Sequence, residues 1–198
     1  MSCTAPMITF SETIETLLKP YAELLGQDFN GYRNHLYRIV NFCHLLKPLS
    51  KTESDKIEIA AVFHDLAIWT DKTADYVPPS EGLARTYLES IDFPEWSDEI
   101  CQMIHDHHKI TRSQPKPTEG KTSKTSELLS EEDSLTEIFR QADWIDVTLG
   151  LRSFGLKRDQ INSVIKQFPD EGFHPLLARV VRSQLFKHPF NPLPMLKW

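Results

Sequence analysis

The sequence predicts an all-α protein, a compact bundle of several helices that forms one domain over residues 1–198. Apolar residues recur at the three- and four-residue spacing of helices along most of the chain, and no convincing alternating strand pattern interrupts them. A length of 198 residues allows one domain with a substantial core, or at most one domain with appendages. Hydrophobic residues make up 40% and charged residues 25%, as in ordinary globular proteins.

The individual helices are placed by their start signals, their apolar spacing and their breaks. Thr9 and Glu12 have the spacing of a capping box that opens a first helix, and Pro20 is expected to break or kink that helix. Ser50 and Glu53 repeat the capping pattern before another apolar run. The further helices are predicted over about 32–46, 50–67, 80–90 (beginning at Ser80), 97–108, 134–147, 156–168 and 175–187.

Two segments have a different composition. Residues 111–133 are polar and rich in Ser, Thr, Lys and Pro, which predicts a mobile loop inside the domain. The tail, about 186–198, is rich in proline and in large apolar groups. We expect it to pack over the domain surface or against a partner subunit, which would make the protein a homodimer. A proline-rich ligand for another domain is the alternative.

Composition and charge exclude several classes of protein. A net charge of -6 argues against a broad surface for nucleic acid. No apolar stretch is long enough to cross a bilayer, and residues 1–10 lack the pattern of a secretory signal. Cys3, Cys43 and Cys101 are scattered, which argues against a disulfide framework or a thiolate zinc site. We therefore expect a cytoplasmic protein with no membrane or nucleic-acid partner.

A histidine and an aspartate stand at the point where one predicted helix leaves its apolar run. His64 and Asp65 follow the apolar residues 60–63, and the chain then enters the loop-like residues 70–79. Neighbours on a helix point about 100° apart, so the two side chains can converge on one point only near a helix end. An imidazole and a carboxylate are good ligands for a divalent transition metal. Two ligands are too few, so other helices must supply more.

Two other helices offer inward-facing groups of the same kind. His35 shares a helix face with Ile39, and Asp143 follows Ala142 on the apolar face of its helix. A carboxylate among apolar neighbours is costly unless it is paired or bound to a metal. Each residue alone has a simpler explanation, a hydrogen-bonded core histidine or a buried ion pair. Together with the first pair they would supply two nitrogens and two oxygens, leaving positions open for water and substrate.

The order of these groups along the chain resembles the signature of the HD-domain superfamily of metal-dependent phosphohydrolases. The resemblance covers about residues 30–150 and includes Arg38 three residues after the first histidine. It implies an HD-type helical bundle that binds one divalent metal ion, either Mn, Fe, Ni, Co, Zn or Mg. It also implies hydrolysis of a small phosphate ester, with nucleotides among the candidates. The flanking residues resemble a branch of predicted hydrolases without an assigned substrate. The implied metal ligands are His35, His64, Asp65 and Asp143.

The resemblance also suggests which groups move protons. Family members with two metals often carry an I-x-x-H pattern, which Ile104 and His107 match, but residues 66–104 lack the additional histidine. One metal is therefore favoured, and His107 would bind the substrate phosphate or transfer protons. Ile68 stands where nucleotidase-like members often carry Glu, so Asp71 or Asp75 would have to substitute. The candidate catalytic residues are Asp65, His107 and Asp71.

Other side chains are candidates for contact with the substrate. Arg38 presents a forked set of donors that suits a phosphate, although it could equally pair with Glu15 or Glu58. Lys109 could contact the phosphate or simply form the solvated basic end of its helix. Trp69 follows the ligand pair closely and is expected to line the pocket. The candidate substrate-binding residues are therefore Arg38, His107, Trp69 and Lys109.

Two further functions remain open at the level of sequence. Some relatives of the HD fold are mixed-valence di-iron oxygenases, a chemistry that needs two irons per chain. A non-catalytic HD module that only binds a ligand would keep the pocket without turnover. The number of metal ions per chain and a screen of phosphate esters would separate these functions from the hydrolase.

Overall fold

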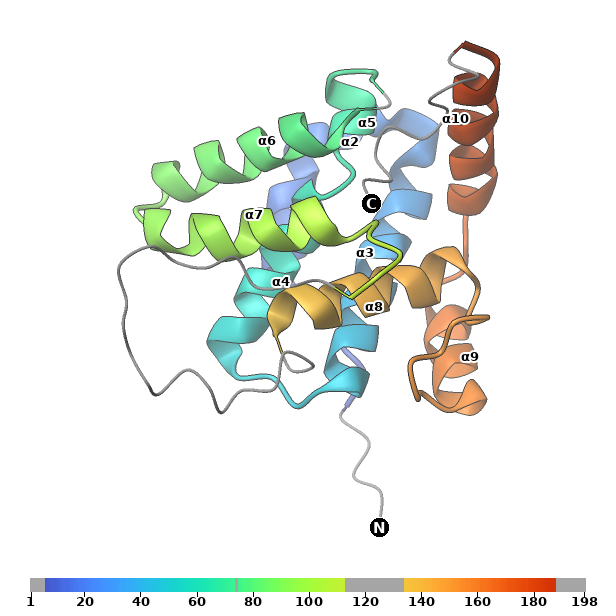
Figure 1. Cartoon of the computed structure of the whole chain (residues 1–198). Coiled ribbons are helices and arrows are strands. Elements are labelled where there is room, and N and C mark those ends of the chain that lie inside the picture. Colours follow the sequence, from blue (N-terminus) through green and yellow to red (C-terminus); the bar gives the residue numbers. More distant parts are fainter. Residues whose placement is uncertain (1–5, 74, 113–133, 188–198) are drawn as a thin grey trace.

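The structure is a computed structural model that describes residues 6–73, 75–112 and 134–187 (Figure 1). All regular elements in these ranges are helices, which confirms the predicted all-α class. The α-helices are α1 (Glu12–Leu18), α2 (Ala22–Leu25), α3 (Phe29–Leu46), α4 (Lys51–Phe63), α5 (Ala67–Thr70), α6 (Val77–Ser90), α7 (Ser97–Asp106), α8 (Leu135–Val147), α9 (Arg158–Gln167) and α10 (Phe173–Lys187). Short 3₁₀ turns lie at Lys19–Tyr21, Gly26–Asp28 and Pro94–Trp96.

Helix α3 is the central element of the bundle. It packs against α8, α4 and α9, and more lightly against α10. Apolar side chains on several of its faces are buried, among them Leu36, Ile39, Val40 and Phe42, because neighbours cover it from several directions. Burying a side chain of this size stabilises the fold by about 1.5–3 kcal/mol. A polar side chain on the inward faces of α3 must therefore find a partner inside the protein.

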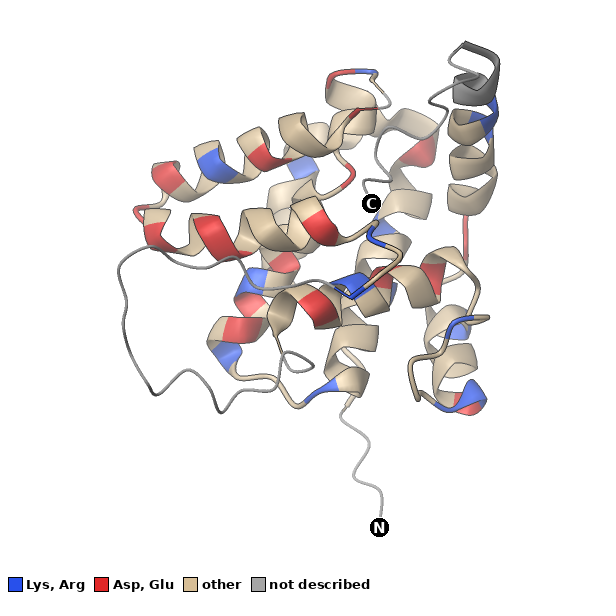
Figure 2. Cartoon of the chain, in the orientation of Figure 1, with Lys and Arg blue, Asp and Glu red and all other residues tan. Residues whose placement is uncertain are grey.

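Helices α6 and α7 run side by side, and α7 also packs on α8 (Figure 1). The predicted start of α6 at Ser80 is wrong: the helix begins at Val77, with prolines in its first turn. A first-turn proline is tolerated because its missing N–H has no helical acceptor there. Acidic residues lie along α6 and α7, and α6 carries a basic residue as well; both kinds of charge also occur on other helices (Figure 2).

The helix starts were predicted with mixed success. The capping box of Ser50 and Glu53 is present at the start of α4. At the start of α1, however, Ser11 caps the helix by accepting a hydrogen bond from the backbone of Ile14, so the predicted Thr9 cap is wrong. Pro20 does interrupt the helix, and the chain continues there as a 3₁₀ turn.

Two helix ends matter for function. Helix α4 ends at Phe63, earlier than the predicted residue 67, and the chain turns before α5 begins at Ala67. Helix α7 ends at Asp106; His107 is its C-cap, with helical backbone angles, and His108 lies in the turn that follows. Both ends point ligand-type side chains toward α3 and α8.

The remaining sequence predictions fall partly outside the described residues. Most of the loop predicted over residues 111–133 lies there, as does nearly all of the tail predicted over 186–198. Within the described part of the chain, no helix combines the length and apolar character needed to cross a membrane.

Candidate metal centre

The four predicted metal ligands meet in the interior of the bundle. The Nε2 atoms of His35 and His64 lie 3.1 Å apart. Asp65 Oδ2 is 3.5 Å from Nε2 of His64 and 4.0 Å from Nε2 of His35. Asp143 Oδ1 lies 3.7 Å from Nε2 of His35 and 3.9 Å from Nε2 of His64. All four residues are at most 3% exposed, so this cluster is shielded from bulk water.

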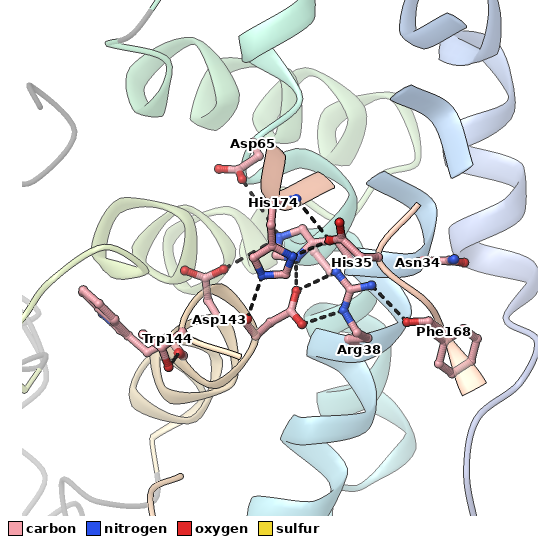
Figure 3. Close-up of polar contacts among 12 residues, drawn as sticks. Asn34, His35, Arg38, Asp65, Asp143, Trp144, Phe168 and His174 are labelled. Atoms are coloured by element: carbon pink, nitrogen blue, oxygen red, sulfur yellow. Dashed lines mark hydrogen bonds and ion pairs between the residues drawn. The ribbon is translucent and has the colours of Figure 1, made fainter. Parts of the chain in front are cut away.

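Three separate parts of the chain supply these groups, as the sequence predicted. His35 lies in the middle of α3, and Asp143 lies on the inward face of α8, the helix that packs on it. His64 is the C-cap of α4 and keeps helical backbone angles, and Asp65 lies in the turn that follows. Figure 3 shows Asp65 and Asp143 on one side of His35, and Arg38 on the other.

The hydrogen bonds of the histidines fix which ring nitrogen faces the cluster. His64 donates from Nδ1 to the carbonyl oxygen of Ala61 at 2.7 Å, and His35 donates from Nδ1 to the carboxylate of Asp146 at 2.6 Å. Each Nδ1 therefore carries a hydrogen, because its partner can only accept. In the neutral rings both Nε2 atoms then present lone pairs to each other and to two carboxylates. Such a convergence of acceptors is unfavourable unless a proton or a metal ion lies between them.

Two buried atoms without hydrogen-bond partners point to the same conclusion. Among the described residues, Asp65 Oδ1 and His107 Nε2 are buried and accept or donate no hydrogen bond. These atoms lie 3.4 Å apart. An unsatisfied buried polar group costs about 1–3 kcal/mol. Asp65 and His107 are therefore satisfied either by pairing with each other, with His107 protonated, or by a cation bound between them.

The spacing of the donors suits a single transition-metal ion. With metal–ligand bonds of about 2.0–2.1 Å, adjacent ligands lie about 3.0 Å apart at right angles and about 3.4 Å apart in a tetrahedron. The pairs formed by His35 with His64 and by His64 with Asp65 fall near these values, at 3.1 and 3.5 Å. Ligand atoms of His35, His64 and Asp143 lie within 4.8 Å of one another, and so do those of His64, Asp65 and His107. A divalent ion therefore fits either group of three, and the two groups share His64.

Burial affects the two kinds of ligand differently: it keeps His64 ready to bind a metal, but it favours the protonated form of Asp143. Burial lowers the pKa of His64 to about 3, which keeps the imidazole neutral and able to bind a metal at neutral pH. Burial, together with the nearby charge of Asp65, raises the pKa of Asp143 to about 8. A bound cation would favour the ionised form of Asp143 and compensate for its burial.

The end of α7 adds two histidines to the cluster. His107 Nδ1 donates to the carbonyl oxygen of Ile104 at 2.6 Å, so its Nε2 also faces inward. Ligand atoms of His64, Asp65 and His107 lie within 4.8 Å of one another, and the same holds for His107, His108 and Asp143. His105 pairs with Glu81 on α6, while His108 joins the cluster.

Arg38 lies next to the cluster but is fully engaged elsewhere. Its guanidinium binds both carboxylate oxygens of Asp146 and the backbone carbonyls of Phe168 and Pro169. The alternative pairing with Glu15 or Glu58 is wrong, because Asp146 is the partner. A phosphate contact from Arg38, the other prediction, would require these buried bonds to break.

The other predicted site residues lie around or outside the cluster. Trp69 is buried against Tyr32, with ring centroids 4.8 Å apart, and Tyr32 in turn packs on His64. The ammonium of Lys109 lies 2.9 Å from Asp106. Asp71 is exposed and accepts a hydrogen bond from Thr70, so the structure does not bring it to the buried ligands.

Sequence reasoning missed three residues of the site. Asp146 stands three residues after Asp143 on α8, a spacing that places both carboxylates on one helix face and could have revealed it. His108 was missed because the predicted helix extended past the true end of α7. Tyr76 lies in the loop before α6, and its hydroxyl contacts His108. No local sequence pattern predicts this pairing.

A surface pocket of about 350 Å³ lies elsewhere, between the N-terminal segment, α3 and α9. Its lining includes Met7, Asn41 and Gln160, and none of the candidate ligands.

Comparison with known proteins identifies no relative, since no family model, no curated protein and no solved structure matches the chain.

Proposed function

We propose that the chain is a metal-dependent phosphohydrolase of the HD type that acts on a small phosphorylated metabolite in the cytoplasm. The observation that carries the proposal is the buried convergence of two imidazole nitrogens and two carboxyl groups from α3, the end of α4 and α8. The sequence order that resembles the HD superfamily supports it independently.

The donor set favours catalysis over a purely structural metal. Structural zinc sites are closed by four ligands that are often thiolates, whereas catalytic sites keep a position for water or substrate. Here the ligands are imidazoles and carboxylates, which suit Mn, Fe, Co, Ni or Zn. A metal ion bound there would lower the pKa of its water and polarise a phosphoryl oxygen.

Side chains beside the metal ligands would transfer the protons of the reaction. His107 has a buried Nε2 without a hydrogen-bond partner, 3.4 Å from Asp65, so it can hold or release a proton beside the ligands. The bond from its Nδ1 to the carbonyl of Ile104 keeps the ring in this orientation. We assign proton transfer to Asp65 and His107, and we also assign contact with the substrate phosphate to His107.

Metal analysis combined with a panel of phosphate esters tests the proposal. The purified chain should hold one divalent ion and release phosphate from at least one ester, whereas His64→Gln and Asp65→Asn should lose both properties. His105→Ala is the matched control, since this histidine lies in the same segment as His107 but faces Glu81. Circular dichroism would establish that each variant is folded. Undiminished metal and activity in both ligand variants would refute the proposal.

A second candidate function rests on the group formed by His107, His108 and Asp143. Ligand atoms this close could hold a second ion beside the first, as a di-iron oxygenase would need. Two irons per chain, with no phosphatase activity, would favour the oxygenase. Tight ligand binding without turnover of any ester would instead identify a non-catalytic binding module.

A further inference from the structure

The histidines of the cluster are oriented in two different ways. His64 and His107 each donate from Nδ1 to a backbone carbonyl in the preceding turn, those of Ala61 and Ile104. These acceptors are held in place by their own helices. His35 lies in the middle of α3, and it donates to the side chain of Asp146 on α8 instead of to a backbone carbonyl.

A side-chain acceptor can orient a ring only if it is itself held. Arg38 binds Asp146 through two bonds, from Nε to Oδ1 at 2.5 Å and from Nη2 to Oδ2 at 2.9 Å. A bidentate bond of this kind fixes the plane of the carboxylate. Both groups are at most 1% exposed, so water does not compete for them.

The link between α9 and α10 holds this pair from behind. Arg38 Nη1 donates to the carbonyls of Phe168 and Pro169 at 3.1 and 3.2 Å. His174 Nε2 lies 3.0 Å from the backbone carbonyl of Asp146. The ring of Phe173 stacks on His35, with centroids 3.9 Å apart and planes 20° apart. The imidazole is thus held at its edge by a carboxylate and on one face by a phenyl ring.

We propose that Asp146 is the positioning residue of His35: it holds the ring so that Nε2 faces the metal position, and Arg38 holds Asp146 in turn. The inference rests on the proposed metal site. It also explains why two buried carboxylates on one face of α8 have different roles. Asp143 faces the ligand atoms, whereas Asp146 is already neutralised by Arg38 and serves the far side of the histidine. Groups that orient metal-bound histidines in this way typically contribute about 10- to 100-fold to metal affinity.

The affinity for Zn²⁺, measured by competition with a chromophoric chelator, tests the role of Asp146. Asp146→Asn should weaken binding by about 10- to 100-fold. Glu137→Gln is the matched control, because it removes another buried carboxylate that binds an arginine on the same helix, here Arg140. The control should bind Zn²⁺ within about twofold of the unmodified chain. Equal affinity of Asp146→Asn and the unmodified chain would overturn the inference while leaving the metal site intact.

Asp146→Asn would leave the buried charge of Arg38 without its carboxylate partner and could unfold the chain. A second variant therefore removes both groups. The double variant Asp146→Asn with Arg38→Met should fold, and it should bind Zn²⁺ more weakly than the unmodified chain does. Normal affinity in a folded double variant would overturn the inference. If the unmodified chain takes up no Zn²⁺ at all, the proposed function itself fails.

A measurement on the metal-free, unmodified chain is independent of both variants. Long-range ¹H–¹⁵N spectra of ¹⁵N-histidine-labelled protein report which ring nitrogen carries the hydrogen. We expect His35 to be the tautomer protonated at Nδ1, with an unprotonated Nε2. A His35 protonated only at Nε2 would contradict the role of Asp146, whatever the metal affinity.

Discussion

At the scale of single residues, the site depends on which nitrogen of each histidine is left for a metal. His35, His64 and His107 all use Nδ1 for a hydrogen bond, which leaves Nε2 for the cluster. A neutral imidazole offers one acceptor, so the partner of one nitrogen decides the role of the other. The carboxylates of Asp65 and Asp143 then bring negative charge to a place that burial makes costly.

The protonation of Asp143 leads to a pH dependence of metal binding. Burial and the nearby charge of Asp65 raise the pKa of Asp143 to about 8, which favours the protonated carboxyl at neutral pH in the metal-free chain. Only the ionised form binds a metal, and binding should therefore release a proton below pH 8. Zn²⁺ affinity should rise with pH between about 6 and 8 and then level off.

Calorimetry in buffers with different ionisation enthalpies would count the released protons. Asp143→Asn has no such proton to release, so its weaker binding should depend less on pH over the same range. A pH profile of the same slope in both chains would show that Asp143 is not the group that titrates.

At the scale of secondary structure, helix ends and close helix contacts place the ligands. The pairs His64-Asp65 and His107-His108 both stand just beyond a helix end, where consecutive side chains can converge. His35 depends instead on how closely α3 approaches the link between α9 and α10. Gly31, one turn before His35, allows that approach: a Cβ there would lie 2.9 Å from the carbonyl oxygen of Glu171 and 3.1 Å from the backbone nitrogen of Phe173.

Substituting Gly31 should therefore affect both stability and the site. Gly31→Ala should lower the free energy of unfolding by about 1–3 kcal/mol, since backbone atoms must move to admit the methyl group. It should also weaken Zn²⁺ binding, because Phe173 would shift from the ring of His35. Urea denaturation and metal titration measure the two effects.

Gly82 supplies the control for this experiment. It lies on α6 with nothing within 4 Å of an added Cβ, so Gly82→Ala should stabilise the chain by about 0.5–1 kcal/mol through helix propensity alone. A Gly31→Ala chain as stable as the Gly82→Ala chain would show that the contact between α3 and the link is not tight.

At the scale of the whole molecule, the cluster joins α3, α4, α7 and α8 across the core. Acceptors that face one another inside the fold destabilise it unless a cation lies between them. A bound metal should therefore stabilise the entire fold rather than a local segment. Helices α9 and α10 are also connected to the site, because Arg38 binds the carbonyl of Phe168 and Phe173 stacks on His35. Residues after about 150, beyond the region that resembles the HD superfamily, therefore pack against the same site.

Removing the metal should make this coupling visible. A chain stripped with a chelator should unfold at lower urea concentration, and Zn²⁺ at about 100 times its Kd should restore about 2.7 kcal/mol. The gain follows from binding to the folded state alone. A His35→Ala chain, which lacks one ligand, should respond far less to the same Zn²⁺ concentration. Identical unfolding midpoints with and without metal would contradict the prediction.

The sequence by itself determined the all-α class, most helix positions and the four central groups. Apolar spacing and the cap of Ser50 are local signals, and ligand-type side chains on apolar faces must meet inside the bundle. Tertiary structure decided the partners of those groups. Asp146 and Arg38 are 108 residues apart in the chain, and only the packing of α8 on α3 brings them together. Local patterns cannot specify such a pairing, because it depends on the rotation and crossing of two helices rather than on either helix alone.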